Sequence, residues 1–130
     1  MARSKYHFSA AERYAVFTVH GENCYLCHEP INLKTMEVDH IIPESLLDDP
    51  VRLTVILKDL GRPGDFDLNS FANWMPACRS CNGTKRATVF EPSPVVQLVL
   101  QNAAGKAARV QSLATTTVSD RIVTIRPFRK

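Results

Sequence analysis

The amino-acid sequence predicts an α+β fold in which short strands lie between helices. Apolar residues recur at helical spacing near both ends of the chain, whereas residues 33–43 alternate apolar and charged side chains as a strand does. Two Cys-x2-Cys pairs flank this alternating stretch, at 24–27 and 78–81. A length of 130 residues fits one domain with a modest core. We therefore expect a single domain, residues 1–130.

The charges are unevenly spread along the chain, although the formal net charge is only +3. Residues 21–50 hold seven acidic residues against one Lys, and residues 78–130 hold nine Lys or Arg against two acidic residues. A basic half of this kind suits a polyanionic partner, and a solvated basic surface explains it equally well. No apolar run approaches the ~20 residues of a membrane span. Since Glu12 and Arg13 interrupt any signal-peptide core, we expect a cytoplasmic protein that does not contact a membrane.

The first half of the chain is expected to hold two helices around one strand. The segment Ser-Ala-Ala-Glu is a capping box, which predicts an N-terminal helix over about 9–20. The alternating stretch is expected to end as a strand near Pro43. Asp49 is suited to cap a second helix, and Gly61 is suited to end it.

The second half is expected to hold a strand, a turn and further helix. A short extended segment precedes the second cysteine pair, and a helix is expected to start near Cys81. A C-terminal extension follows over about 91–130. Apolar spacing predicts a helix over 94–113, which Gly105 weakens, and β-branched residues predict a strand over 121–128.

The two cysteine pairs predict a structural zinc site. Structural Zn²⁺ takes four tetrahedral ligands, and a two-residue gap lets both sulfurs of one turn face the same ion. A thiol redox pair would need only one of the two pairs, and haem attachment at Cys-x-x-Cys-His would leave the second pair unused. We therefore expect one zinc ion bound by Cys24, Cys27, Cys78 and Cys81.

Between the cysteine pairs lies the segment Val-Asp-His-Ile-Ile-Pro, which places an acid and a histidine at the expected strand end. Asp39 offers a hard oxygen ligand suited to Mg²⁺, and His40 can take a proton near neutral pH. Taken alone, these two residues are explained better by a capped strand end with a hydrogen-bonded histidine than by a catalytic site.

The residues around this segment favour a catalytic site over a capped strand end. The first cysteine pair, Val-Asp-His-Ile-Ile-Pro and Asn-Trp-Met-Pro-Ala-Cys-Arg-Ser-Cys-Asn-Gly-Thr-Lys together resemble the HNH nuclease family, whose core is the ββα-metal fold. The resemblance covers roughly residues 24–86, the expected core of the domain. It implies a metal-dependent endonuclease that hydrolyses DNA phosphodiester bonds and takes Mg²⁺ or Mn²⁺ as its catalytic ion.

The resemblance also implies roles for individual residues. By position, His40 resembles the general base that activates water, and Asn73 resembles the residue that orients the hairpin and the base. Asp39 and Asn82 resemble the pair that binds the catalytic divalent ion. An Asn stands at the last position, where the family also uses His, and an amide oxygen remains a competent Mg²⁺ ligand.

Basic residues near this motif are expected to contact double-stranded DNA, bound by a monomer or a homodimer. Lys85 is the preferred phosphate contact, and Arg79 and Arg86 accompany it. Trp74 is expected to lie in the core rather than to stack on a base. A basic tail can track a DNA backbone, or it can serve only solubility; it consists of Arg121, Arg126, Arg129 and Lys130.

Two alternatives from other classes of protein remain open. The first is a non-catalytic, zinc-stapled module that binds nucleic acid. The second is a structural zinc adaptor that binds protein through the acidic residues of 21–50. Neither alternative requires Asp39, His40 and Asn82 together, so the endonuclease is the favoured interpretation.

Overall fold

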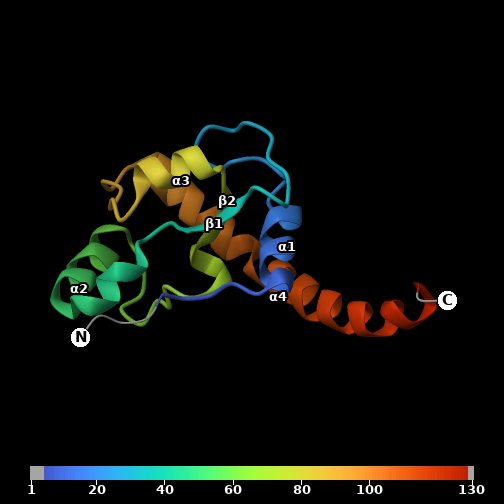
Figure 1. Cartoon of the computed structure of the whole chain (residues 1–130). Helices are drawn as coiled ribbons and strands as arrows, with labels where there is room; N and C mark the ends of the chain where they lie inside the picture. The colour runs from blue at the N-terminus through green and yellow to red at the C-terminus, as the bar shows by residue number, and fades with distance from the viewer. Residues whose placement is uncertain (1–4, 129–130) are drawn as a thin grey trace.

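A two-stranded antiparallel sheet lies at the centre of the fold. The computed structural model describes the backbone of residues 5–128 and the side chains of residues 5–117. Strand β1 (Glu37–His40) pairs with β2 (Trp74–Ala77) in a register that sets Asp39 opposite Met75. The described residues form four α-helices around this sheet (Figure 1), so the expected α+β class is confirmed.

Helix α1 (Ala10–Val19) begins at the expected capping box. Ser9 Oγ accepts from the backbone N–H of Glu12 at 3.1 Å, and the Glu12 carboxylate accepts from the Ser9 N–H at 2.8 Å. These two bonds satisfy donors that a helix start otherwise leaves unpaired. The expected N-terminal helix is thereby confirmed.

The connection between the two strands contains three helical elements. They are the 3-10 helix η1 (Glu44–Asp48), helix α2 (Pro50–Asp59) and the 3-10 helix η2 (Phe71–Asn73). Asp49 caps α2 through the N–H of Arg52, and Gly61 follows the helix with a φ of 68°. Asp49 therefore caps the start of the helix and Gly61 follows its end, as the two residue types predict.

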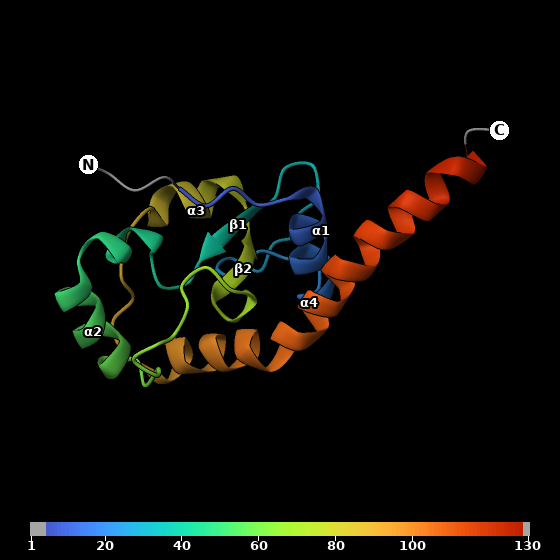
Figure 2. The same cartoon turned by 90° about the horizontal axis from the view of Figure 1, so that it is seen from below.

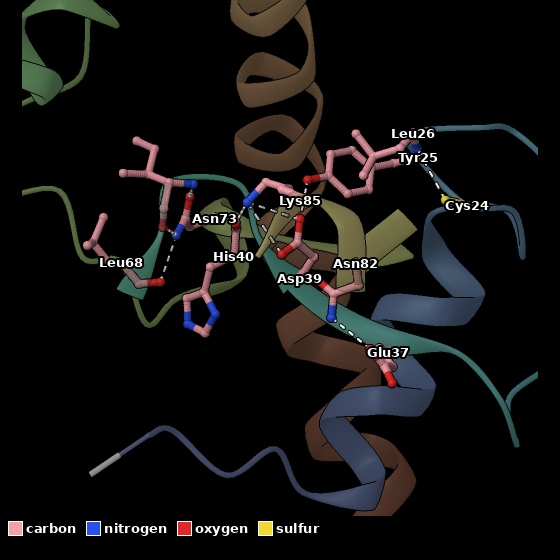
Figure 3. Close-up of polar contacts among 11 residues, drawn as sticks. Cys24, Tyr25, Leu26, Glu37, Asp39, His40, Leu68, Asn73, Asn82 and Lys85 are labelled. Carbon is pink, nitrogen blue, oxygen red and sulfur yellow. Dashed lines mark hydrogen bonds and ion pairs between the residues drawn. The ribbon is translucent and has the colours of Figure 1, made fainter. Parts of the chain in front are cut away.

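Helix α3 (Arg79–Lys85) follows β2 directly, with Cys78 as its N-cap. It begins two residues earlier than expected, because the Cys78 sulfur accepts from the N–H of Cys81 at 3.3 Å and so supplies the cap. The helix lies across β1, which brings Asn82 and Lys85 over the strand (Figure 3).

Helix α4 (Pro94–Phe128) is longer than the sequence predicts. It passes Gly105 without a break, and its C-terminal part extends beyond the other elements (Figure 2). The expected strand over 121–128 is wrong, because this segment continues the helix. An established helix adds residues at little cost, whereas a strand needs a partner edge, and the described sheet pairs only β1 with β2. The side chains of Arg121 and Arg126 lie outside the described part, as do Arg129 and Lys130 entirely.

Two apolar clusters hold these elements together, and α4 contributes to both. Trp74, which is 2% exposed, lies in the first cluster as expected, and no described group bonds its Nε1. The first cluster comprises Ala15, Val16, Phe17, Met36, Val38, Phe71, Trp74, Val110 and Ala114. The second comprises Ile41, Ile42, Leu46, Leu57, Leu60, Leu68, Met75, Leu100 and Ala103.

Within the described part of the chain, none of the helices combines the length and the apolar character needed to cross a membrane.

Two leucines of α4 test whether this helix is part of the core. Leu100 is fully buried, whereas Leu98 is 60% exposed on the same helix. We expect Leu100→Ala to lower the free energy of unfolding by about 2–5 kcal/mol, because it removes buried methyl groups and leaves a cavity. We expect Leu98→Ala to change it by less than about 0.5 kcal/mol. Urea denaturation measures both, and equal losses would contradict this packing of α4.

Candidate metal centre and adjoining pocket

The four cysteines lie together although their two pairs are far apart in the sequence. Their Sγ atoms all lie within 4.8 Å of one another, and Cys27 Sγ is 3.9 Å from Cys78 Sγ. Four sulfurs around a tetrahedral Zn²⁺ at ~2.3 Å are separated by about 3.8 Å. The cluster can therefore hold a zinc ion, and the expected meeting of the two cysteine turns is confirmed.

Backbone geometry builds the first cysteine turn. The N–H of Leu26 points at Cys24 Sγ at 3.4 Å, and the N–H of His28 donates to the Cys24 carbonyl at 2.8 Å. His28 adopts a φ of 66°, which turns the chain back after the second cysteine. Since N–H groups directed at sulfur favour the thiolate, both turns are suited to bind a cation.

Tyr25 connects the first cysteine turn to the sheet. Its N–H donates to the carbonyl of Pro76 at 2.9 Å, and its hydroxyl donates a hydrogen bond to the Asp39 carboxylate. Burial, followed by the charge of Asp39, raises the pKa of Tyr25, so the hydroxyl keeps its proton. The sequence analysis missed this residue; its only signal is an aromatic hydroxyl between two ligand cysteines.

Asp39 is a buried carboxylate, 5% exposed, with a cation beside it. Lys85 Nζ lies 3.4 Å from Asp39 Oδ2 and also donates to the His40 carbonyl at 2.8 Å. Burial raises the pKa of Asp39, while the Lys85 charge and the Tyr25 hydrogen bond oppose that shift. Burial shifts the pKa of Lys85 in the other direction: it lowers that pKa, and the Asp39 charge opposes the decrease.

Lys85 is buried, and its expected contact with a DNA phosphate stays a prediction. Its side chain is only 4% exposed, and its ammonium joins α3 to the end of β1. The physical reason is its position one helical turn after Cys81, on the face of α3 that packs against the sheet. Arg79 and Arg86 are exposed instead.

His40 is half-buried at the end of β1, among aromatic rings. Its Nε2 lies 2.7 Å from Asn69 Oδ1, and its ring centroid lies 5.6 Å from that of Phe8. Burial lowers the pKa of His40, and the Asn69 hydrogen bond and the Glu44 charge act in the opposite direction. Asn69 was not singled out from the sequence, because nothing local marks it as a partner of a histidine 29 residues away.

Asn73 is fully buried and fixes the chain that follows His40. Its Oδ1 accepts from the N–H of Ile42 at 2.9 Å, and its Nδ2 donates to the carbonyls of Ile42 and Leu68, each at 2.9 Å. Its backbone carbonyl also accepts from the N–H of Ile41 at 2.8 Å. The side chain thus replaces backbone pairing directly after the end of β1 (Figure 3).

A pocket with a volume of about 500 Å³ lies over β1 and α3. Asp39, His40 and Asn82 all line it, so the structure brings these three sequence-predicted residues to one cavity. The remaining walls come mainly from Arg86, Glu44 and the N-terminal segment that precedes α1, through Lys5, Tyr6 and Phe8. The Asn82 side chain bonds Glu37, a residue that the sequence analysis did not single out.

Comparisons with known proteins give no further information about identity. No protein-family model matches the chain, and neither a curated protein nor a solved structure matches it.

Zinc binding by the cysteine cluster is testable by removing one ligand. We expect about one zinc per chain in the wild type, and loss of both zinc and folded structure in Cys78→Ser, because three ligands do not close a structural site. Metal analysis and circular dichroism measure the two effects. Ser80→Ala, an exposed change within the same turn, serves as the control. A zinc-free wild type with the same melting curve would contradict the assignment.

The buried ion pair makes a second prediction. We expect Lys85→Met to lower the free energy of unfolding by about 3–5 kcal/mol, because it leaves a buried carboxylate without its counter-charge. Arg86→Met, at the next and exposed position, is expected to have little effect. Thermal or urea denaturation compares the variants, and equal stabilities would show that Lys85 is not buried against Asp39.

Proposed function

We propose that this protein is a metal-dependent endonuclease of the HNH type that hydrolyses DNA phosphodiester bonds. In this proposal β1, β2 and α3 form the ββα-metal core, and the four cysteines bind a structural zinc ion. The observation that carries it is the shared pocket of Asp39, His40 and Asn82. An acid, a base and an amide in one cavity match what phosphodiester hydrolysis needs.

His40 is the general base of the proposed reaction. With Asn69 Oδ1 as the acceptor, Nε2 carries the ring proton, so Nδ1 keeps a lone pair that can take a proton from water. The lowered pKa keeps the ring neutral near pH 7, as a base must be. Asn73 supports this role by fixing the backbone directly after His40.

Asp39 and Asn82 would hold a Mg²⁺ or Mn²⁺ ion, since both line the pocket and both offer hard oxygen donors. Such an ion, when bound, neutralises charge on the phosphate oxygens and on the leaving oxygen. Lys85 already contacts Asp39, so the carboxylate would be shared between the ammonium and the divalent ion. Lys5 and Arg86 line the same pocket and supply cationic groups for the DNA backbone.

A non-catalytic module that binds nucleic acid is the second candidate, and one observation favours it. In the structure the Asp39 carboxylate is already neutralised by Lys85 and hydrogen-bonded by Tyr25. A pocket whose carboxylate already has these two partners can bind a DNA phosphate through its cationic side chains without hydrolysing the phosphodiester bond. The two functions differ in whether DNA is cleaved when a divalent ion is added.

A plasmid assay tests the proposal. We expect the zinc-loaded protein to nick supercoiled plasmid with Mg²⁺ or Mn²⁺, and we expect His40→Ala to lose at least about 100-fold in rate, the range for a general base. His7→Ala, an exposed histidine of the N-terminal segment, is the matched control.

Gel electrophoresis separates the outcomes. An intact plasmid with every metal, together with retained DNA binding, would favour the non-catalytic module. Equal nicking by wild type and His40→Ala would show that the activity does not use this pocket.

A further inference from the structure

Helix α3 and strand β1 are joined by two polar contacts that lie side by side. Lys85 Nζ contacts the Asp39 carboxylate, and Asn82 Nδ2 donates to Glu37 Oε1 at 2.8 Å (Figure 3). Glu37 and Asp39 are two residues apart on a strand and share a face, while Asn82 and Lys85 are three apart on a helix and share a face. The Lys85 contact involves Asp39, which is one proposed metal ligand. The Glu37 contact holds Asn82, which is the other.

The second contact decides which end of the Asn82 amide faces the pocket. An asparagine offers an acceptor oxygen and a donor nitrogen of similar size, so only its partners fix the orientation. An ionised carboxylate accepts hydrogen bonds and donates none, so Glu37 selects the nitrogen. Among the described residues no group donates to Asn82 Oδ1, which leaves that oxygen available to a ligand.

The orientation matters for a cation. A divalent ion binds an amide through its oxygen, and a reversed amide would present two N–H hydrogens to the ion. Arg79 Nε lies 3.3 Å from the second Glu37 oxygen, which restrains the carboxylate from the far side. That pair is exposed and contributes little energy of its own, so the bond from Asn82 is the more informative contact.

We propose that Glu37 is a positioning residue that turns Asn82 Oδ1 toward the divalent ion held with Asp39. The inference rests on the proposed function, since it assumes that Asp39 and Asn82 bind that ion. Glu37 itself touches neither ion nor substrate in this assignment. It acts through Asn82 as the outer partners of metal ligands do, and loss of such a partner lowers metal affinity about 10–100-fold.

Replacing the amide by a carboxylate separates orientation from charge. Asp at position 82 has two equivalent oxygens and needs no orientation, whereas Asn82 does. Glu37→Ala removes one negative charge in either background. The difference between the two losses measures the positioning effect together with the repulsion between Glu37 and the carboxylate that Asn82→Asp introduces, and Glu37→Gln, which removes the charge and keeps an acceptor oxygen, separates the two.

The experiment measures Mn²⁺ affinity of the zinc-loaded full chain by titration calorimetry, without DNA. The proteins are wild type, Glu37→Ala, Asn82→Asp and the double variant. We expect Glu37→Ala to weaken Mn²⁺ binding at least about tenfold more in the Asn82 background than in the Asn82→Asp background.

Two further variants serve as controls. Glu37→Gln, whose oxygen can still accept from Asn82, is expected to have a Mn²⁺ affinity between those of wild type and Glu37→Ala. Glu91→Ala removes the same charge from an exposed site and is expected to leave the affinity unchanged.

Two results would overturn the inference in distinguishable ways. Equal losses in both backgrounds would show that Glu37 acts only through its charge, and the proposed metal site would stand. Equal Mn²⁺ affinity of wild type and Asp39→Ala would overturn the metal site itself, and the positioning role with it.

Discussion

The meeting of the two cysteine turns is the constraint on which the rest of the structure depends. Cys27 and Cys78 are 51 positions apart, yet their sulfurs lie 3.9 Å from each other. Cys78 is also the N-cap of α3, so the cluster sets where that helix begins and how it lies on β1. A sheet of two four-residue strands is marginal by itself, and needs packing or a metal to persist. Helix α4 supplies such packing, and the cysteine cluster can bind such a metal.

Tyr25 shows how closely the cluster and the pocket are linked. It lies between two of the cysteines, bonds β2 through its backbone and reaches Asp39 with its hydroxyl. A displacement of the first cysteine turn would therefore remove a hydrogen bond from the carboxylate on which the pocket depends. Helix α4 shares both apolar clusters with residues of the sheet, which gives the strands a support separate from the cysteine cluster. The first cysteine turn, through Tyr25, and helix α4, through the first apolar cluster, thus both support the strand that carries Asp39 and His40.

The sequence was most informative where one residue type has one strong local meaning. The capping box of α1, Asp49 before α2 and the paired cysteines all act over a few residues, and each lies where its chemistry predicts.

The strand expected over 121–128 is wrong, because local β-propensity cannot supply a partner strand. The burial of Lys85 could not be read from the sequence either, because it results from the packing of α3 on β1. Asn69, Tyr25 and Glu37 were missed for the same reason, because their partners lie 29, 14 and 45 positions away in the sequence.

The buried pair of Asp39 and Lys85 also bears on the proposed chemistry. Burial alone favours the neutral acid at Asp39, and a neutral acid is a poor ligand for a cation. The Lys85 ammonium and the Tyr25 hydroxyl both favour the carboxylate, so they oppose the effect of burial on the pKa of Asp39. The same ammonium would repel such an ion and so lower its affinity at this carboxylate. In the proposed site Lys85 would oppose the ion at Asp39, so the second ligand would matter more. The contact of Asn82 with Glu37 would then decide whether the pocket offers a cation one oxygen ligand or two.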